Sequence, residues 1–305
     1  MDETPAWLAA DWGTSRLRVW ALAADGRVRA RRVAEAGMGR LAAPADFTAV
    51  FRDLTADWRG AGTLPVVVCG MAGAREGWRE AAYARAGAPL AELADAAVAV
   101  PAAGADLDVR ILPGLRQDDP PDVMRGEETK LAGLAAAGHG DGVVLLAGTH
   151  DKWVDLAGGR VRRFFTSMTG DAFAALAEHS VLKHTLTGDG FDDAAFADAV
   201  AAARAAPAAL VRRAFGLRAT ALLQGLDPAV ARARLSGWLV GAEIADALAV
   251  LDAPRAVTLV GSEAQIARYR VALGAFDAAV DAVDADAVTL AGLRAAHARL
   301  FGASP

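Results

Sequence analysis

Alternating hydrophobic and polar residues near the start of the chain predict a small β-sheet. Leu17, Val19 and Ala21 alternate with Arg18 and Trp20, which is the period of a half-buried strand. An Asp-Gly dipeptide then marks a tight hairpin before a third alternating segment, and an apolar stripe at helical spacing follows. The expected elements are strands at 7–10, 17–21, 27–34 and 65–69, with a helix at 46–58 before the last strand.

The same order of patterns returns after residue 142. An apolar strand ends there in Gly148-Thr149-His150-Asp151, as the first strand ends in Asp11-Trp12-Gly13-Thr14. The hairpin tips Asp25-Gly26 and Gly158-Gly159 follow at similar distances. An internal repeat of about half the chain is a strong clue to architecture, although two hairpins also resemble each other by chance. The expected elements are strands at 143–147, 152–156, 161–165 and 256–260, and helices at 171–182, 193–206, 228–250, 263–273 and 290–300.

A stretch rich in Pro, Gly and Asp, residues 112–122, separates the two halves. Its composition excludes a regular helix because Pro lacks a backbone donor and clashes with the preceding turn. We therefore expect this stretch to be a loop near a domain boundary.

Composition limits the classes of partner. The chain has 305 residues, which is enough for two packed halves. The 32 Lys and Arg residues against 37 Asp and Glu residues give a net charge of -5. Proteins whose main partner is a nucleic acid usually carry a basic face, so this balance argues against one. A small anionic substrate stays open, because it needs only a local positive pocket.

Cysteine content and hydropathy bear on location. Cys69 is the single cysteine, so neither a disulfide framework nor a Cys-rich zinc site can be built, and a reducing compartment is expected. The segment Met1–Pro5 has neither the basic nor the apolar region of a secretory signal. The apolar runs are too short or too interrupted by charge to span a membrane. We expect a soluble cytoplasmic protein, with the oligomeric state, a homodimer included, left open.

Three predicted strands end in a Gly followed by a small hydroxyl residue, at Gly13-Thr14, Gly148-Thr149 and Gly261-Ser262. A Gly lets the backbone turn tightly and approach a ligand, and successive N–H groups in such a turn form an anion-binding nest. These turns therefore predict a site for nucleotide phosphates. Asp11 beside the first nest would repel a phosphate unless a cation bridges the two, which implies Mg²⁺. The alternative is an Asp that caps its own turn.

Glu127 and Glu128 are adjacent at the start of a predicted helix. Acidic residues are ordinary there because they complement the helix dipole, but one of them could also take a proton from a substrate hydroxyl. Adjacent residues point about 100° apart on a helix, so only one is expected to face a cleft. Lys152, which follows His150 and the second Gly turn, either reaches a phosphate or is a solvated strand residue. The histidines without defensible metal-ligand spacing are His139, His179, His184 and His297.

Six segments, in this order, resemble the 2-dehydro-3-deoxygalactonokinases, which belong to the sugar kinase and actin-like ATPase superfamily. They are Ala10–Arg18, Glu35–Leu41, Cys69–Gly73, Met124–Thr129, Gly148–Val154 and Met168–Gly170. The resemblance covers nearly the whole chain, and Arg125–Thr129 and Gly148–Val154 are its most specific parts. The chain departs from the family pattern at Asp171, where relatives have Glu.

The resemblance implies an α/β fold of two actin-like (ribonuclease-H-like) lobes, with mixed sheets flanked by helices and a central cleft. Residues 1–125 would form an N-terminal lobe with the first phosphate hairpin and the sugar-acid pocket. Residues 126–305 would form a C-terminal lobe with the second phosphate hairpin and the adenosine side. The last helix is left free to cross back to the first lobe.

The resemblance also implies a kinase that transfers the γ-phosphoryl group of ATP to O6 of 2-dehydro-3-deoxy-D-galactonate, a step in galactonate breakdown. Asp11 would hold Mg²⁺, and Glu127, or else Glu128, would be the base, a role that an Asp fills in related sugar kinases. The nucleotide would contact Gly13, Thr14, Ser15, Gly148, Thr149, His150, Lys152, Gly261 and Ser262. The sugar acid would contact Arg16, Gly37, Met38, Arg40, Gly70, Met71, Trp78 and Arg125.

Three other functions stay open at this point. One is a kinase for another 2-keto-3-deoxy sugar acid, such as the gluconate epimer. A second is a non-catalytic sugar sensor on the same fold, which would need neither Asp11 nor the Glu127-Glu128 pair. A third is a phosphatase, which would position a water where the kinase needs a sugar-sized pocket beside residues 37–40.

Overall fold

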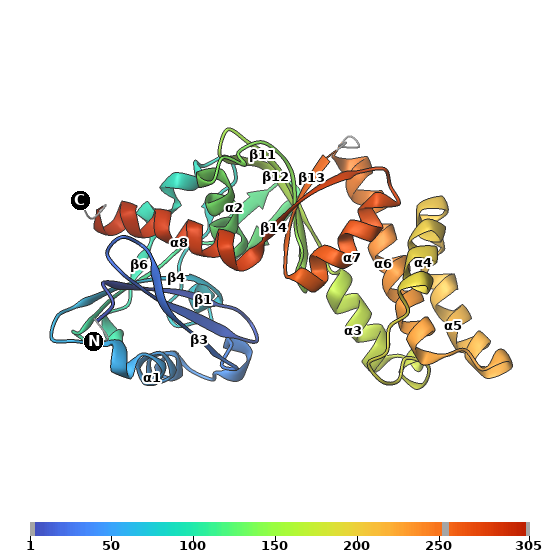
Figure 1. The fold of residues 1–305 in the computed structure, drawn as a ribbon, viewed down its shortest axis with the longest axis horizontal. Helices are drawn as coiled ribbons and strands as arrows, with labels where there is room; N and C mark the ends of the chain where they lie inside the picture. The colour runs from blue at the N-terminus through green and yellow to red at the C-terminus, as the bar shows by residue number, and fades with distance from the viewer. Residues whose placement is uncertain (1–3, 252–255, 303–305) are drawn as a thin grey trace. The chain divides into compact units, whose positions relative to one another are not determined.

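The computed structural model describes residues 4–251 and 256–302, and the chain divides into two compact units (Figure 1). Unit 1 comprises residues 4–141, 156–164 and 285–302, and unit 2 comprises 142–155, 165–251 and 256–284. Residues 1–3 of the segment Met1–Pro5, which lacks the features of a secretory signal, lie outside the described residues. The division counts 126–141 and the last helix with unit 1, whereas the expected boundary lay between residues 125 and 126.

Unit 1 is built on a six-stranded sheet in the order β3-β2-β1-β4-β7-β6. The central β1 is antiparallel to β2 and parallel to β4, and β4 is parallel to β7. The strands are β1 (Trp7–Trp12), β2 (Leu17–Leu22), β3 (Val28–Ala34), β4 (Leu64–Gly70), β6 (Val98–Ala99) and β7 (Leu107–Ile111).

Both faces of β1 are buried, because alternate side chains enter two different cores. Leu8, Ala10 and Trp12 pack with the phenylalanines of α1 (Pro44–Leu54). Trp7 and Ala9 pack with the leucines of α8 (Ala285–Phe301). The last helix therefore completes the core of unit 1, beside α2 (Glu127–Ala136), which packs against it (Figure 1).

Unit 2 repeats this plan. Its five-stranded sheet has the order β12-β11-β10-β13-β14, which matches the order of the first five strands of unit 1. β10 is parallel to β13, and β13 to β14. The strands are β10 (Gly142–Leu146), β11 (Asp151–Ala157), β12 (Arg160–Ser167), β13 (Ala256–Gly261) and β14 (Ala279–Asp284), and β11 and β12 extend into unit 1.

The internal repeat and the fold class are thus confirmed: the chain has two actin-like lobes with mixed sheets flanked by helices. The remaining α-helices are α3 (Thr169–His179), α4 (Asp193–Ala205), α5 (Leu210–Gln224), α6 (Pro228–Val250) and α7 (Glu263–Gly274). Short 3-10 turns lie at Met38–Arg40, Ala56–Trp58, Met71–Gly73, Leu90–Ala96, Pro101–Ala103, Val181–His184 and Pro207–Ala209.

The expectation of a loop over 112–122 was wrong. Residues Leu115–Asp118 (β8) and Pro121–Met124 (β9) pair as an antiparallel hairpin, which Ala84–Arg85 (β5) extends to three strands. The prolines are compatible with this hairpin because Pro120 lies in the turn and Pro121 is the first residue of its strand. The stretch lies within unit 1, so it does not mark the boundary between the units.

Among the described residues, no single helix has the length and apolar character of a membrane span. One bent pair, Asp193–Ala205 with Pro207–Gln224, meets those criteria by length and composition only.

Candidate functional site

The first Gly turn connects β1 to β2 and is held from behind by a neighbouring loop. The Gly13 N–H donates to the carbonyl of Arg16 at 2.8 Å and closes the turn. Three N–H groups of residues 37–39 donate to the carbonyls of residues 13–15 at 3.0–3.1 Å. Those carbonyl oxygens would repel an anion, so their engagement by the loop leaves an exposed tip at Thr14 and Ser15 that is suited to a phosphate.

Gly37 is required for this contact. A Cβ built on Gly37 would lie 2.2 Å from the carbonyl carbon of Ser15 and 2.3 Å from the oxygen of Thr14. Backbone atoms cannot yield to such an overlap. Gly37 and Met38, which the sequence assigned to the sugar acid, therefore support the first Gly turn through their backbone.

Arg16 and Arg40 converge on one acidic residue. Nε of Arg16 donates to Oε1 of Glu35 at 2.7 Å, and Nη1 of Arg40 donates to the Glu35 carbonyl at 3.1 Å. Both arginines are exposed. Each has further N–H donors, so both keep the capacity to bind an anion.

Asp11 is a buried carboxylate with two side-chain partners, Arg18 and Cys69. Only 7% of Asp11 is exposed, and its Oδ2 accepts Nη1 of Arg18 at 2.6 Å. Its Oδ1 lies 3.7 Å from Sγ of Cys69, whose thiol pKa is raised well above its usual range by burial and by the charge of Asp11. The registers of β1 with β2 and with β4 place both partners directly opposite Asp11.

Arg18 was missed as a partner of Asp11 in the sequence. The signal was present, because a Gly turn that closes between residues 13 and 16 sets the register of the hairpin and places residue 18 opposite residue 11. The carboxylate bonds a guanidinium rather than the backbone of its own turn.

The loop after β4 approaches the first strand closely. Gly70 has a φ of 86°, and a Cβ there would lie 2.6 Å from the carbonyl oxygen of Trp12. Met71 is half-buried, whereas Trp78 is only 3% exposed. The indole of Trp78 packs against Trp12 and donates to Oγ1 of Thr48 at 2.8 Å. Trp78 is therefore a core residue that anchors this loop.

Arg125 lies beneath the same loop with part of its hydrogen-bonding capacity unused. Nη2 donates to the carbonyl of Ala81 at 2.8 Å, and the guanidinium stacks on Tyr83 at 4.3 Å from the ring centre. Nε and Nη1 are buried and have no hydrogen-bond partner within the described part of the chain. Unsatisfied buried donors are rare, so this cation is suited to an added acceptor.

Glu127 and Glu128 begin α2 and differ in environment. Oε2 of Glu127 accepts the N–H of Arg125 at 3.0 Å, and the residue is half-buried. Glu128 is 1% exposed and accepts the N–H of Gly126 at 2.7 Å. Burial, followed by the charge of Glu127, raises the pKa of Glu128 to about 8. Of the two, Glu127 is the accessible carboxylate that is suited to accept a proton.

The second Gly turn, in unit 2, is exposed at Gly148, Thr149 and His150. Nε2 of His150 lies 2.5 Å from Oδ2 of Asp171 in the first turn of α3. A Cβ on Gly170 would lie 2.7 Å from the carbonyl of Thr149, so the start of α3 packs against this turn. Asp171, the departure from the family pattern, is therefore a partner of His150.

Lys152 is not a solvated strand residue. It is 4% exposed on β11, between Asp151 and Trp153, which are also buried. Of the two readings of its sequence position, the solvated one was wrong.

A buried network beneath the second turn was not anticipated from the sequence. Oδ1 of Asp151 accepts the N–H of Gly148 at 2.8 Å, and the hydroxyl of Tyr269 lies 2.8 Å from Oδ2 of Asp151 and 3.0 Å from Oε2 of Glu243. Trp153 donates to Oε1 of Glu243 at 2.7 Å, and the Thr169 hydroxyl donates to Oε2. Burial and the charge of Asp151 raise the pKa of Glu243 to about 8.

The network has a consistent arrangement of protons. A tyrosine hydroxyl has one proton to donate, yet the Tyr269 oxygen contacts two carboxyl groups. Protonated Glu243 can donate to Tyr269, which then donates to Asp151, and Asp151 in turn accepts the Gly148 N–H. The second Gly turn is thus tied to the core of unit 2 by a chain of hydrogen bonds.

A cavity of about 320 Å³ lies in unit 2, and its wall includes Gly148 and Tyr269. Arginine and aromatic side chains form another part of the wall, with Arg268 at 4.4 Å from the ring of Phe191 and Arg232 at 5.3 Å from that of Phe173. Such a mixture of flat apolar and cationic groups suits a heteroaromatic ligand with phosphates. None of these four side chains was singled out in the sequence.

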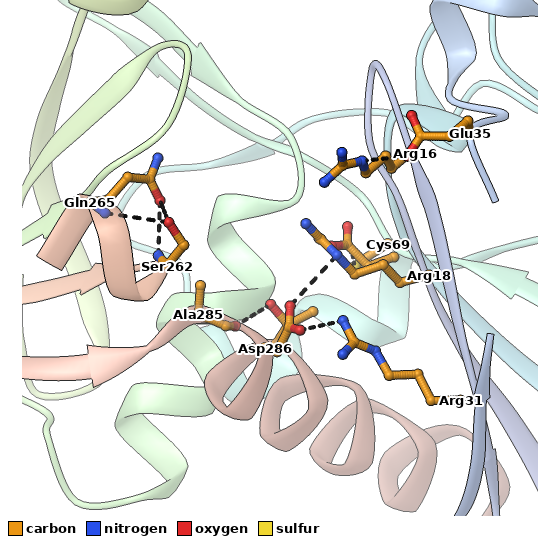
Figure 2. Close-up of polar contacts among 11 residues, drawn as sticks. Arg16, Arg18, Arg31, Glu35, Cys69, Ser262, Gln265, Ala285 and Asp286 are labelled. Atoms are coloured by element: carbon orange, nitrogen blue, oxygen red, sulfur yellow. Dashed lines mark hydrogen bonds and ion pairs between the residues drawn. The ribbon is translucent and has the colours of Figure 1, made fainter. Parts of the chain in front are cut away.

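The third Gly turn borders this cavity indirectly. Ser262 caps α7 in a reciprocal arrangement with Gln265, whose Oε1 accepts the Ser262 N–H at 2.8 Å (Figure 2). Gln265 and Ala264 line the cavity, and a Cβ on Gly261 would lie 3.1 Å from Cβ of Gln265. Gly261 and Ser262 therefore shape the wall through the start of α7.

A metal site made by the protein alone is absent from the described residues, where no group of three or more His, Cys, Asp or Glu side chains could hold an ion. Mg²⁺ is usually bound by one or two carboxylates together with substrate phosphates and water. Asp11, a buried carboxylate beside an anion-binding turn, fits that role as a single protein ligand.

Comparison with known proteins agrees with this architecture. The sequence model of the 2-keto-3-deoxy-galactonokinase family matches residues 11–296. A Rhizobium meliloti protein provisionally named a 2-dehydro-3-deoxygalactonokinase is 47% identical, over 94% of this chain and 95% of its own. The 2-dehydro-3-deoxygalactonokinase of Escherichia coli is 34% identical, over 97% and 99%. A Sinorhizobium meliloti crystal structure, provisionally named for the same activity, matches with a TM-score of 0.91 and 46% identity, over 97% and 99% of the two chains. The chain therefore belongs to the 2-keto-3-deoxy-galactonokinase family.

Proposed function

We propose that this protein transfers the γ-phosphoryl group of ATP to O6 of 2-dehydro-3-deoxy-D-galactonate, in the breakdown of galactonate. Its family and its relatives at 47% and 34% identity support this activity. The observation that carries it in the structure is the unit 2 cavity, which combines aromatic, cationic and Gly-turn walls as a nucleoside triphosphate requires.

In this proposal the cavity takes the adenosine of ATP, and Gly148, Thr149 and His150 bind its phosphates by backbone N–H groups and side-chain donors. Lys152 contributes its positive charge to the nucleotide site from its buried position on β11. Gly261 and Ser262 shape the wall of the adenosine cavity through the start of α7. The first Gly turn, Gly13 to Ser15, supplies a second phosphate cradle. Functionally, residues 1–125 carry this cradle and the sugar-acid pocket, and 126–305 carry the adenosine side. A kinase that draws on ATP and has a single reduced cysteine would act in the cytoplasm.

Asp11 would hold Mg²⁺ together with the nucleotide phosphates. The ion supplies positive charge that offsets the negative charge of the phosphates during transfer. Asp11 is paired with Arg18 at 2.6 Å, so the carboxylate must share or exchange this partner when the nucleotide is bound.

Glu127 acts as the general base. It accepts the proton of the O6 hydroxyl while O6 bonds to the γ-phosphorus and the bond from that phosphorus to the bridging oxygen breaks, which releases ADP. The accessibility of Glu127 supports this assignment over Glu128, which is buried and protonated at neutral pH.

The sugar-acid carboxylate would be recognised by arginines. Arg16 and Arg40 are exposed near the first Gly turn, and Arg125 has two buried donors without a partner among the described residues. Arginine matches a carboxylate in bidentate geometry. Gly70, Met71 and the anchored Trp78 shape the loop that covers Arg125, and Gly37 and Met38 shape the turn.

The test is an ATP-coupled assay of the purified protein across a panel of 2-keto-3-deoxy sugar acids. We expect the galactonate epimer to be the best substrate, with phosphate attached at O6 by nuclear magnetic resonance of the product. Preferential turnover of the gluconate epimer would change the substrate. ATP hydrolysis at a rate that no sugar acid alters would instead indicate a phosphatase.

A further inference from the structure

Asp286, in the first turn of α8, joins two arginines of adjacent strands, Arg18 on β2 and Arg31 on β3. Its Oδ1 lies 3.6 Å from Nε of Arg18, and its Oδ2 lies 2.5 Å from Nη2 of Arg31 (Figure 2). An acidic residue is common at this position of a helix because it complements the helix dipole. Two ion-pair partners that are distant in the sequence are more than that role requires.

Arg18 is shared between Asp286 and Asp11. One edge of the guanidinium bonds the buried Asp11 at 2.6 Å, and the opposite Nε faces Asp286 at 3.6 Å. Asp11 is the tighter partner, yet it is also the carboxylate proposed to hold Mg²⁺. A cation at Asp11 and the guanidinium of Arg18 would repel each other at this distance.

We propose that Asp286 is a positioning residue that retains Arg18 when the nucleotide's Mg²⁺ takes Asp11, and so sets the Mg²⁺ concentration that the enzyme requires. This inference rests on the proposed function. Asp286 offers Arg18 a second carboxylate within reach, so the guanidinium can leave Asp11 without losing its charge partner. Arg31 competes for Asp286 and limits how strongly it holds Arg18.

The sign of the effect follows from the charges. Without the charge of Asp286, Asp11 is the only carboxylate that pairs with Arg18 among the described residues, so the cation must break a stronger pair. The loss of Asp286 also removes a negative charge near Asp11 and releases the positive charge of Arg31. Each of these changes weakens cation binding.

The experiment measures ADP binding by isothermal titration calorimetry over a series of Mg²⁺ concentrations, with no sugar acid present. For Asp286→Asn, we expect the Mg²⁺ concentration that gives half of the Mg²⁺-dependent gain in ADP affinity to rise about three- to fivefold, the scale of one partly exposed ion pair. Asp286→Glu should restore most of the wild-type value.

Two variants separate this role from general effects of charge or folding. Asp95→Asn removes the same charge from a carboxylate that pairs with Arg299, near the other end of α8, and should leave the Mg²⁺ dependence unchanged. Arg31→Gln leaves Asp286 to Arg18 alone, so the half-maximal Mg²⁺ concentration should fall about twofold. This variant also provides the test if Asp286→Asn does not fold.

The possible results separate a failure of the proposed role of Asp286 from a failure of the proposed kinase function. If wild-type protein binds ADP with a Mg²⁺ dependence that neither Asp286→Asn nor Arg31→Gln alters, the positioning role is wrong and the kinase assignment stands. A shift of both variants in the same direction would also overturn it. If the wild type does not bind ADP with Mg²⁺, the proposed function and the inference fail together.

Discussion

The carboxyl group of Glu128 accepts the N–H of Gly126 at 2.7 Å while its neighbour Glu127 accepts that of Arg125 at 3.0 Å. The two acids thus satisfy consecutive N–H groups at the start of one helix, but only Glu128 is fully enclosed. This difference in burial separates a candidate base from a structural acid.

Replacement of Glu127 by Gln should lower kcat at least about a hundredfold, because it removes the proton acceptor for the substrate hydroxyl. The measurement is a steady-state ATP-coupled assay with 2-dehydro-3-deoxy-D-galactonate. Glu92→Gln, which neutralises an exposed acid of the Leu90–Ala96 turn, is the charge-matched control and should retain full turnover. Near-normal kcat in Glu127→Gln would move the base to Glu128 or elsewhere.

The pH dependence of stability should reveal the buried Glu128. Its pKa is about 8 in the folded protein against 4.5 for the ordinary group. Between these values the unfolded chain releases a proton that the folded chain keeps, so the free energy of unfolding falls as pH rises and levels off above the folded pKa.

The glutamine of Glu128→Gln is neutral in both the folded and the unfolded protein. Between about pH 5.5 and about pH 7.5, the free energy of unfolding should therefore fall less in this variant than in the wild type, by roughly 2 kcal/mol. Urea unfolding of both proteins at the two pH values gives this difference. Glu243 contributes a slope of the same sign to both and cancels in the comparison. Parallel pH profiles would mean that Glu128 is ionised in the folded protein.

Removal of the Tyr269 hydroxyl should destabilise the protein by about 1–3 kcal/mol, because two buried carboxyl groups lose their shared partner. Tyr269→Phe should also weaken ADP binding, since Tyr269 lines the unit 2 cavity and supports Gly148 through Asp151. Tyr83→Phe is the matched control for stability, at a residue that is 39% exposed, and should change the free energy of unfolding by less than about 0.5 kcal/mol. Equal stability of the two variants would contradict the bridging role.

A methyl group at Gly37 should displace the first Gly turn. We expect Gly37→Ala to lose several kcal/mol of stability or to lose phosphoryl transfer by at least about a hundredfold, since the clash is with backbone atoms. Gly62→Ala, where a Cβ would meet nothing within 4 Å, is the control. Unfolding free energy and kcat are measured for both. Wild-type behaviour of Gly37→Ala would show that the loop at 37–39 moves freely from the hairpin.

The local pattern of hydrophobic and turn residues was sufficient to predict the repeated succession of strands and the first two Gly turns. Strand period and hairpin signals depend only on residues that are close together in the sequence. The family resemblance then named the motifs. The strand Leu107–Ile111 alternates in the same way but was overlooked. The strand Ala279–Asp284 has Asp at every third position and so lacks the strand period, and helix α5 was not anticipated. For β8 and β9, the prolines hid a hairpin that tolerates them at its turn and at the first residue of a strand.

The contacts that define the site depend on residues far apart in the chain. Tyr269 meets Asp151 across 118 positions, and Arg18 meets Asp286 only because the last helix returns to the first sheet. A tryptophan such as Trp78 is a common ligand-binding residue, yet here its side chain is buried in the core. No spacing rule within one sequence reports such distances.

The return of α8 to unit 1 also fixes the order in which this protein can mature on the ribosome. Leu290, Leu293 and Ala296 cover one face of the sheet that begins at Trp7, and His297 stacks on Trp7 at 4.0 Å. During synthesis the whole of unit 2 emerges before this cover does. Unit 1, whose first strands are translated first, is therefore completed last. A chain that stops short of α8 would leave one face of β1 exposed to water.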